Sequence, residues 1–385
     1  MTNAPLVFKN DNDHLEWHKQ REYIIAMDGI DETSRKKLVD AYVVLEHELG
    51  KGFLKTSSYD HPIRQMISNR TDWQIQELIK FVETLLILKQ SDSGYPRLKK
   101  LLLPNVKAKL EGVPFIEIAQ EYIKAGFRVS FPNDINSDKS PDLEIINPEN
   151  NNRFFIEVSA IDESDKRTIR TDNYRFLRSQ FYARPLRIDC FCRQKEVIEK
   201  DYYSEFEKII SHSKLKVIQL GQTIYYSDKY LEFLIITKDK SDELTEVCKT
   251  NNLRRFDVEG MNLNFDETDR LTNHKIKKEA IQILPEFNGL LYFPCSFLFF
   301  LTADMNNTIT SLEDYLSKFK NIIGIVFFAK YADGFGEEKF QKTGKHIFSR
   351  KVNKALCSEF LFIYNDSCEV KISGKTIEKI YKTFS

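Results

Sequence analysis

Apolar positions in the first third of the chain recur at the three- and four-residue spacing of helices. Asp31 or Thr33 is placed to cap one helix that ends near Gly50, and Thr71 is placed to cap a second helix. A shorter helix is expected over residues 96–110. The pattern therefore predicts a helical N-terminal region over residues 1–110, and no catalytic constellation is evident within it.

The spacing of apolar residues changes near residue 112. A helix is expected from 114 to 125, with Gly126 placed to stop it. After this helix we expect strands at 127–131, 142–146 and 153–161, a helix at 164–181 and a strand at 186–192. Later strands are expected at 231–236, 296–301, 322–328 and 359–364, and a charged excursion at 238–280. The order helix, three strands, helix, strand predicts an α/β domain over residues 111–385.

Two acidic residues lie at the strands of this predicted core. Asp142 follows Pro141 at the head of one apolar run, and Glu157 lies inside the next run. Side chains alternate along a strand, so Glu157 and Ser159 share one face. A carboxylate inside an apolar run is costly without a partner. A cation held jointly with Asp142 would be such a partner, and Mg²⁺ prefers carboxylate oxygens.

A third acidic residue lies on the helix before the first strand. Glu117 is nine residues ahead of Gly126, and Glu121, one turn later on the same face, is the alternate candidate. Taken one at a time, an acid after a proline or a single glutamate on a strand is ordinary in proteins. The order of these acids along the predicted elements is what favours a shared site.

These residues resemble the PD-(D/E)xK nuclease superfamily, whose restriction endonuclease-like core carries a helix Glu, a Pro-Asp and a Glu-x-Lys. The resemblance covers residues 113 to about 193. It implies that Asp142 and Glu157 hold Mg²⁺ or Mn²⁺ and that Glu117 assists. The lysine of the family motif positions the attacking water and stabilises the transition state. Ser159 stands at that position here and cannot carry the charge.

The missing amine leaves two interpretations. Another lysine can supply it, and the candidates are Lys139, Lys166 and Lys195, because Lys139 shortly precedes Asp142 and Lys166 opens the next helix. Alternatively, the site binds metal or nucleic acid without cutting.

A basic segment follows the Glu157 strand. Nine basic and two acidic residues lie between 166 and 195, although the net charge of the chain is zero. Arg167, Arg170, Tyr174 and Arg178 follow one another at spacings of three, four and four, which places them on one face of a helix. Arginines with an interleaved tyrosine suit phosphate contacts and base stacking. The alternative is a solvated helix face.

Composition narrows the class of protein. The longest apolar runs are well short of the roughly 20 residues that span a bilayer. The six cysteines are scattered, and the N-terminus does not resemble a signal peptide, so a cytoplasmic protein without a membrane partner is expected. Zero net charge means that any nucleic-acid site must be a local patch.

The sequence as a whole therefore favours a metal-dependent nuclease-like protein that hydrolyses phosphodiester bonds of nucleic acid, with DNA favoured over RNA and RNA left open. By resemblance, its biological setting would be restriction, repair or defence, and a homodimer is compatible with this interpretation. Two alternatives stay open: an inactive pseudonuclease that binds nucleic acid or scaffolds a partner, and an interaction protein that acts through its helical region.

Overall fold

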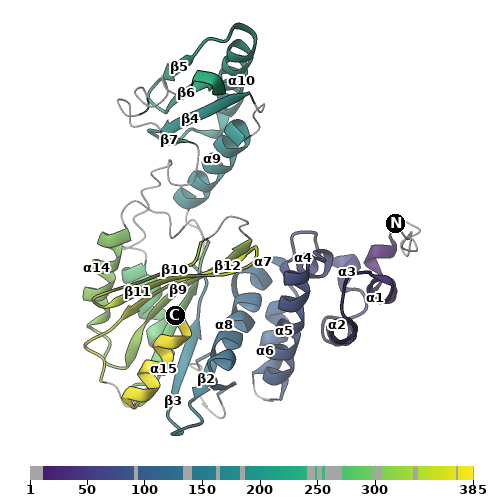
Figure 1. Ribbon diagram of the computed structural model, residues 1–385. Helices are drawn as coiled ribbons and strands as arrows, with labels where there is room; N and C mark the ends of the chain where they lie inside the picture. The colour runs from purple at the N-terminus through teal and green to yellow at the C-terminus, as the bar shows by residue number, and fades with distance from the viewer. Residues whose placement is uncertain are drawn as a thin grey trace. The chain divides into compact units, whose positions relative to one another are not determined.

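The chain folds into two compact units, which are described separately (Figure 1). Unit 1 contains residues 1–161, 268–297 and 309–385, and unit 2 contains residues 162–267 and 298–308. The expected boundary near residue 110 lies inside unit 1. The computed structural model describes residues 12–90, 94–132, 141–161, 165–182, 187–240, 248, 254–255, 271–296, 299, 305–332, 337–369 and 372–384.

The N-terminal part of unit 1 is helical, as the apolar spacing predicts. The side chain of Asp31 caps α2 by accepting a hydrogen bond of 2.9 Å from the backbone N–H of Ser34. The expected helix over 96–110 is interrupted at residues 103–104, where Pro104 cannot donate a helical hydrogen bond, and it continues as a short helix and a π-helical turn. The elements are a short turn at Asp13–Leu15, α1 Trp17–Ala26, α2 Glu32–Leu49, α3 Phe53–Thr56, α4 Pro62–Ser68, α5 Asp72–Lys89, α6 Tyr95–Leu102, α7 Asn105–Lys107, a π-helical turn at Ala108–Gly112 and α8 Val113–Lys124.

These helices share one hydrophobic core with the sheet of unit 1. A single cluster of buried side chains runs from Trp17 in α1 to Phe384 near the C-terminus. Helix α5 packs against α8, and α8 in turn covers the sheet. Gly126 ends α8 at a φ of 79°, a left-handed conformation that glycine adopts without strain. The helical region is therefore a layer of unit 1 that is continuous with the α/β part.

Eight strands of unit 1 form one mixed sheet among the described residues, in the order β1-β2-β3-β8-β9-β12-β11-β10. The strands β3, β8 and β9 run parallel, and the other neighbours pair antiparallel. The chain is thus of the mixed α/β class. The strands are β1 Arg128–Ser130, β2 Leu143–Ile146, β3 Arg153–Val158, β8 Gly289–Pro294, β9 Ile322–Ala332, β10 Lys339–Thr343, β11 His346–Asn353 and β12 Leu356–Tyr364.

The two faces of this sheet are covered by different helices. On one face, Tyr122 of α8 meets Phe154 of β3, and Phe384 of α15 (Gly374–Phe384) stacks on Phe362 of β12. On the other face, Phe155 of β3 packs against Phe287 at a centroid distance of 4.9 Å. The polypeptide returns from β3 to the parallel strand β8 through helix α13 (Ile276–Ala280), and α14 (Met305–Leu316) precedes β9.

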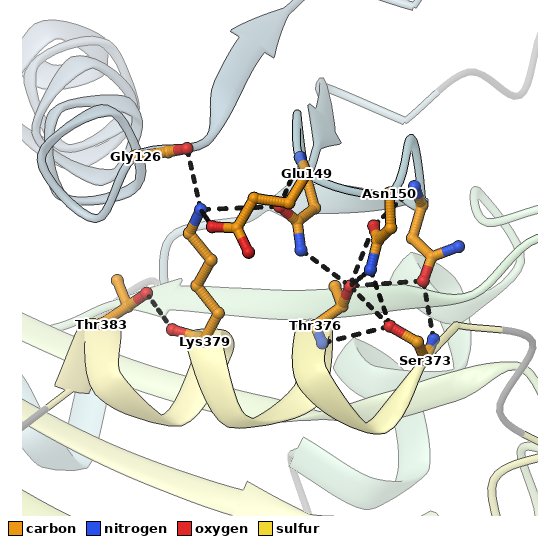
Figure 2. A network of polar contacts seen from close by, with 9 residues as sticks. Gly126, Glu149, Asn150, Ser373, Thr376, Lys379 and Thr383 are labelled. Atoms are coloured by element: carbon orange, nitrogen blue, oxygen red, sulfur yellow. Dashed lines mark hydrogen bonds and ion pairs between the residues drawn. The ribbon is translucent and has the colours of Figure 1, made fainter.

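A polar network fastens α15 to the turn between β2 and β3 (Figure 2). The buried hydroxyl of Thr376 accepts hydrogen bonds of 3.0 Å from the side-chain amides of Asn147 and Asn150. The ammonium of Lys379 donates to the backbone carbonyl of Gly126 and pairs with Glu149, both at 3.0 Å. The C-terminal helix is therefore held to residues more than 220 positions earlier in the chain.

Unit 2 contains its own antiparallel sheet in the order β5-β6-β4-β7. This finding corrects the expected contiguous core over 113–193, because α9 and β4 belong to unit 2 and β4 pairs with β6. In unit 1, α13 and β8 follow β3 instead. The elements of unit 2 are α9 Asp165–Tyr182, β4 Ile188–Gln194, a turn at Lys200–Tyr202, α10 Tyr203–Leu220, β5 Ile224–Ser227, β6 Leu231–Thr237, a turn at Lys238–Lys240 and β7 Arg254–Arg255.

The strand observed nearest to the expected segment 296–301 is β8 at residues 289–294. Of the expected segment, residues 297, 298, 300 and 301 lie outside the described residues. The other expected strands lie within about three residues of their observed bounds at the N-terminal end, and β9 extends four residues further than expected. Within the described parts of the chain, no helix is long and apolar enough to cross a membrane.

Candidate acidic site

The pairing of β2 with β3 brings Asp142 and Glu157 together. Leu143 lies opposite Ile156 in the register, and the backbone N–H of Asp142 donates to the carbonyl of Ile156 at 3.0 Å. The backbone N–H of Val158 donates to Oδ2 of Asp142 at 2.8 Å. Both acids are buried, with exposed fractions of 5% for Asp142 and 6% for Glu157. The two predicted acids therefore lie side by side, at the start of β2 and near the end of β3.

Asp142 is the acid of the pair that has a cationic partner. Its Oδ1 lies 2.9 Å from the guanidinium of Arg97, which comes from α6 and is 63% exposed. Burial raises the pKa of Asp142, and the charge of Arg97 together with the hydrogen bond from Val158 partly offsets that rise. Asp142 is therefore the carboxyl in which a negative charge is best supported.

Glu157 lies beside the carboxylate of Asp142 and, unlike Asp142, forms no ion pair with a described residue. No described residue gives Oε2 of Glu157 a hydrogen-bond partner, although the atom is buried. Burial raises the pKa of Glu157 far above its ordinary value, and the charges of Asp142 and Glu279 raise it further. At neutral pH Glu157 is accordingly protonated in the absence of a cation. A buried oxygen with no partner beside a second carboxylate is a place where a cation would be stabilised.

Ser159 contacts a third acid that the sequence interpretation missed. Its hydroxyl donates a hydrogen bond of 2.8 Å to Oε1 of Glu279, which belongs to α13 and is 4% exposed. The ammonium groups of Lys275 and Lys278 each lie 3.7 Å from the same oxygen. Lys275 is 22% exposed, whereas Lys278 is 71% exposed. The position of the motif lysine thus holds a hydroxyl that is linked through Glu279 to two lysines.

Glu117 does not join this group, which corrects its expected role. Helix α8 packs on the face of the sheet that carries Phe154, whereas Ser159, on the same face of β3 as Glu157, bonds to Glu279 of α13. The carboxylate of Glu117 lies 3.5 Å from Lys330 of β9, and burial raises its pKa. The alternate candidate Glu121 lies 3.9 Å from Lys351.

Lys330 is part of a separate buried charge cluster. Its ammonium lies 2.9 Å from Glu77 of α5 and 3.5 Å from Glu117 of α8. Both Glu77 and Lys330 line a groove of about 870 Å³ between these helices and strands β9 to β12. Asp142 and Glu157 are not among the residues that line this groove. The cluster ties the helical layer to the sheet.

Of the three lysines expected to replace the motif amine, Lys195 is the one with a described side chain. Lys139 lies outside the described residues, and Lys166 lies in α9 with a side chain outside the described part. Lys195 belongs to unit 2, where its ammonium donates to Ser227 at 2.7 Å and to the carbonyl of Asp228 at 2.9 Å.

The expected nucleic-acid stripe on α9 is corrected at one position. Tyr174 is 3% exposed and belongs to the buried face of the helix, so it cannot serve as a stacking platform. Arg178 is exposed. The side chains of Arg167 and Arg170 lie outside the described part of the structure.

The donor set suits a hard cation with few protein ligands. Within the described ranges, no three His, Cys, Asp or Glu side chains are arranged to hold one metal ion. Magnesium sites, however, commonly use one or two carboxylates, with water and substrate oxygens in the remaining positions. Asp142 and Glu157 meet this demand, and the unpartnered Oε2 of Glu157 is the observation that favours a cation there.

The residues that sequence reasoning missed are Arg97, Lys275 and Glu279. Lys275 and Glu279 lie in the segment 238–280, which was interpreted as a charged excursion. Their spacing of four, with apolar Ile276 and Ala280 between and after them, is a short helical signal. Arg97 carries no sequence signal of its own, because it belongs to a helix more than forty residues before Asp142.

Comparisons of the chain with protein-family models, with curated proteins and with solved structures gave no match.

Proposed function

We propose that the chain is a metal-dependent phosphodiesterase that cuts nucleic acid, with DNA as the favoured polymer. The observation that carries this proposal is the buried pair Asp142 and Glu157, in which Oε2 of Glu157 has no described hydrogen-bond partner. An arginine at one acid and a hydroxyl two residues after the other complete a polar cluster of mixed charge.

The topology of unit 1 supports the proposal. Helix α8, strands β1, β2 and β3, helix α13 and strand β8 follow one another in the order helix, three strands, helix, strand. This is the order of the PD-(D/E)xK core, with unit 2 inserted after β3. Asp142 precedes the second strand and Glu157 lies near the end of the third, where the resemblance expects them.

Each residue at the site would have a distinct task. Asp142, held by the N–H of Val158, would offer Oδ1 to a cation, and Glu157 would lose its proton as the cation binds. A bound Mg²⁺ or Mn²⁺ would supply charge neutralisation and an activated water. Arg97, which is mostly exposed, can turn toward a phosphate oxygen.

The charge of the missing motif lysine would come from α13. The ammonium of Lys275 lies 3.7 Å from the carboxylate of Glu279, and that carboxylate accepts a hydrogen bond from the hydroxyl of Ser159. Lys275 is therefore the half-buried ammonium that is connected to position 159 through one carboxylate. Stabilisation of negative charge on the phosphodiester by such a fixed cation is worth several kcal/mol in comparable sites, roughly 3–4 kcal/mol.

A second candidate function is nucleic-acid binding without cutting. It is favoured by one observation, which is that the hydroxyl of Ser159 is satisfied by Glu279, while the nearest lysines contact Glu279 instead. If Lys275 stays paired with Glu279, it cannot supply the ammonium that the attacking water needs.

The experiment is a cleavage assay on plasmid DNA, single-stranded DNA and RNA with Mg²⁺ or Mn²⁺. Asp142→Asn and Glu157→Gln preserve side-chain shape, and each is expected to lower cutting by at least about 100-fold. Glu144→Gln is the matched control, since Glu144 lies on β2, pairs with Arg153 and is only partly buried. Unchanged cutting in both site variants would show that the site is assigned wrongly. Retained binding without any cutting by the unaltered chain would leave only the second function.

A further inference from the structure

An exposed basic strip lies next to the acid pair, on the helical layer of unit 1. Residues 94–112, which include α6, α7 and the turn at 108–112, contain five basic residues and one acidic residue, in a chain whose net charge is zero. Lys99 is half-buried and pairs with Glu48, so it serves the core. The remaining four are Arg97, Lys100, Lys107 and Lys109, and all four are exposed. We call these four residues the basic strip.

The fold of this segment explains why the basic side chains point outward. Tyr95, Leu98 and Leu102 are buried at spacings of three and four, so they form the inner face of α6. Arg97 and Lys100 occupy the outer face at a spacing of three. The strip is thus a consequence of an amphipathic helix whose apolar side is buried in the core of unit 1.

The second half of the strip is folded back against α6. A Cβ atom at Gly112 would lie 2.8 Å from the carbonyl oxygen of Leu101, so the turn at 108–112 approaches the end of α6 at glycine distance. Lys107 and Lys109 are therefore kept close to the helix that carries Arg97 and Lys100 by this contact.

Two contacts place the strip beside the acid pair. Arg97 lies 2.9 Å from Asp142, and Glu111 of the turn is near enough for its charge to affect Asp142. Among the described residues, no ion pair is formed by Lys100, Lys107 or Lys109. The pKa of Asp60 is lowered mainly by a hydrogen bond from Ser58, and the charge of Lys109 lowers it further.

From this arrangement we infer that the basic strip binds the phosphate backbone of nucleic acid and leads it to the acid pair. The inference rests on the proposed function, because it treats Asp142 and Glu157 as the place where the backbone is cut. Phosphates are bound by lysine and arginine without regard to base sequence, and such contacts position the polymer. The inference replaces the stripe on α9 as the candidate for backbone contact.

Two other partners fit a basic surface less well. Leu103 and Val106 are exposed between the lysines, which is a feature of membrane-surface segments. However, α6 has only eight residues, and its apolar face is buried. The carboxylates of an acidic protein that reached Arg97 would be repelled by the neighbouring charge of Asp142. These two partners are therefore outcomes of the test.

The test measures binding of fluorescent duplex DNA, single-stranded DNA and RNA to the full chain by anisotropy, with EDTA present to prevent cutting. Lys100→Gln, Lys107→Gln and Lys109→Gln are combined, and Arg97 is left intact. The matched control combines Lys36→Gln, Lys320→Gln and Lys375→Gln, which remove three exposed lysines elsewhere on unit 1. The strip variant is expected to bind about tenfold or more weakly, with a salt slope lower by about 3. The control is expected to bind within about twofold of the unaltered chain.

Three results would overturn the inference: equal losses in both variants, no binding of any nucleic acid by the unaltered chain, or stronger binding to anionic vesicles or an acidic peptide than to nucleic acid. The cleavage assay decides the proposed function separately. If the strip variant binds nucleic acid more weakly but the unaltered chain cuts none, the proposed phosphodiesterase activity is contradicted and the role of the basic strip is supported. If the chain cuts nucleic acid but the strip variant binds it as tightly as the unaltered chain does, the role of the basic strip is contradicted and the proposed phosphodiesterase activity is not.

Discussion

The backbone N–H of Val158 donates a hydrogen bond of 2.8 Å to Oδ2 of Asp142, so the strand that carries Glu157 also fixes the acid beside it. The position of Asp142 therefore depends on the register of β2 and β3 and not on a flexible loop contact. A shift of one residue would turn Glu157 and Ser159 to the opposite face. The acid pair and the strand pairing are one structural feature.

The first prediction concerns the stability cost of Glu157. Burial raises the pKa of this carboxyl in the folded chain, so its contribution to stability is full below the unfolded pKa near 4.5 and falls as pH rises toward the folded pKa. Glu157→Gln removes this loss. We expect the variant to be more stable than the unaltered chain by roughly 1–3 kcal/mol at pH 8, and nearly equal to it at pH 4.5.

Chemical denaturation at the two pH values measures this difference. Glu144→Gln is the control, because Glu144 lies on the neighbouring strand β2 and pairs with Arg153, and it should not show a gain that grows with pH. A Glu157→Gln variant that is destabilised equally at pH 4.5 and pH 8 would mean that the carboxylate has an unseen partner.

The second prediction concerns Arg97. Burial raises the pKa of Asp142, and the charge of Arg97 opposes that rise. Arg97→Ala should therefore let Asp142 hold its proton to higher pH, and a metal ion must displace that proton. We expect the midpoint pH for Mn²⁺ binding to move upward by about one pH unit or less, since the arginine is largely exposed. Calorimetric titration of Mn²⁺ between pH 5 and pH 8 measures it.

Arg128→Ala is the control for this titration, because Arg128 is an exposed arginine on β1 of the same sheet. A midpoint that stays fixed in Arg97→Ala, or moves equally in Arg128→Ala, would show that Asp142 does not titrate against the metal.

The third prediction separates the two lysines of α13. Lys275 and Lys278 lie at the same distance from Glu279, but only Lys275 is half-buried. If the fixed ammonium serves the reaction, Lys275→Ala should lower kcat by about 100-fold with KM within about threefold, whereas Lys278→Ala should leave kcat within about threefold. Equal losses in the two variants would indicate that both lysines only neutralise Glu279.

Sequence reasoning located the acid pair because both acids lie in strands with clear apolar runs and pair locally. It placed α2, α5 and α8 well, since their apolar spacing is clear, although of the three only α2 has a side-chain capping hydrogen bond. It failed at Glu117, because an acid on a helix gives no sign of which face of the sheet that helix covers. It missed Glu279 because α13 has only five residues, and its short helical signal lies in a segment that was interpreted as a charged excursion.

The insertion of unit 2 was a further limit. The runs at 164–181 and 186–192 do form a helix and a strand, but apolar spacing cannot say with which strand β4 pairs. The parallel partner of β3 comes about 130 residues later, at β8. Long-range strand pairing of this kind depends on tertiary packing, which the local spacing of apolar residues does not predict.

The fourth prediction concerns the charge cluster on the opposite face of the sheet. Burial would lower the pKa of Lys330, but the charges of Glu117 and Glu77 raise it, so the ammonium stays charged. Lys330→Met leaves the buried carboxylate of Glu117 without its cation and Glu77 with Lys80 alone, and should destabilise unit 1 by about 3–5 kcal/mol. The triple variant with Glu77→Gln and Glu117→Gln should recover part of this loss. Absence of recovery would show that the lysine acts through its aliphatic packing.

The last prediction tests the network that holds α15 to the turn between β2 and β3. Thr376 is fully buried, and its hydroxyl meets the side chains of Asn147 and Asn150 (Figure 2). Thr376→Val keeps the shape but leaves the buried amide of Asn147 unpaired, whereas the amide of Asn150 keeps its hydrogen bond of 2.8 Å to Ser373, so we expect a loss of about 1–3 kcal/mol in unfolding free energy. Thr383→Val is the matched control in the same helix, because its hydroxyl donates only to the carbonyl of Lys379 within α15. It should cost less than about 1 kcal/mol. Since the turn joins the strand that follows Asp142 to the strand that carries Glu157, Thr376→Val should also weaken Mn²⁺ binding, and unchanged binding would show that the turn does not set the acid pair.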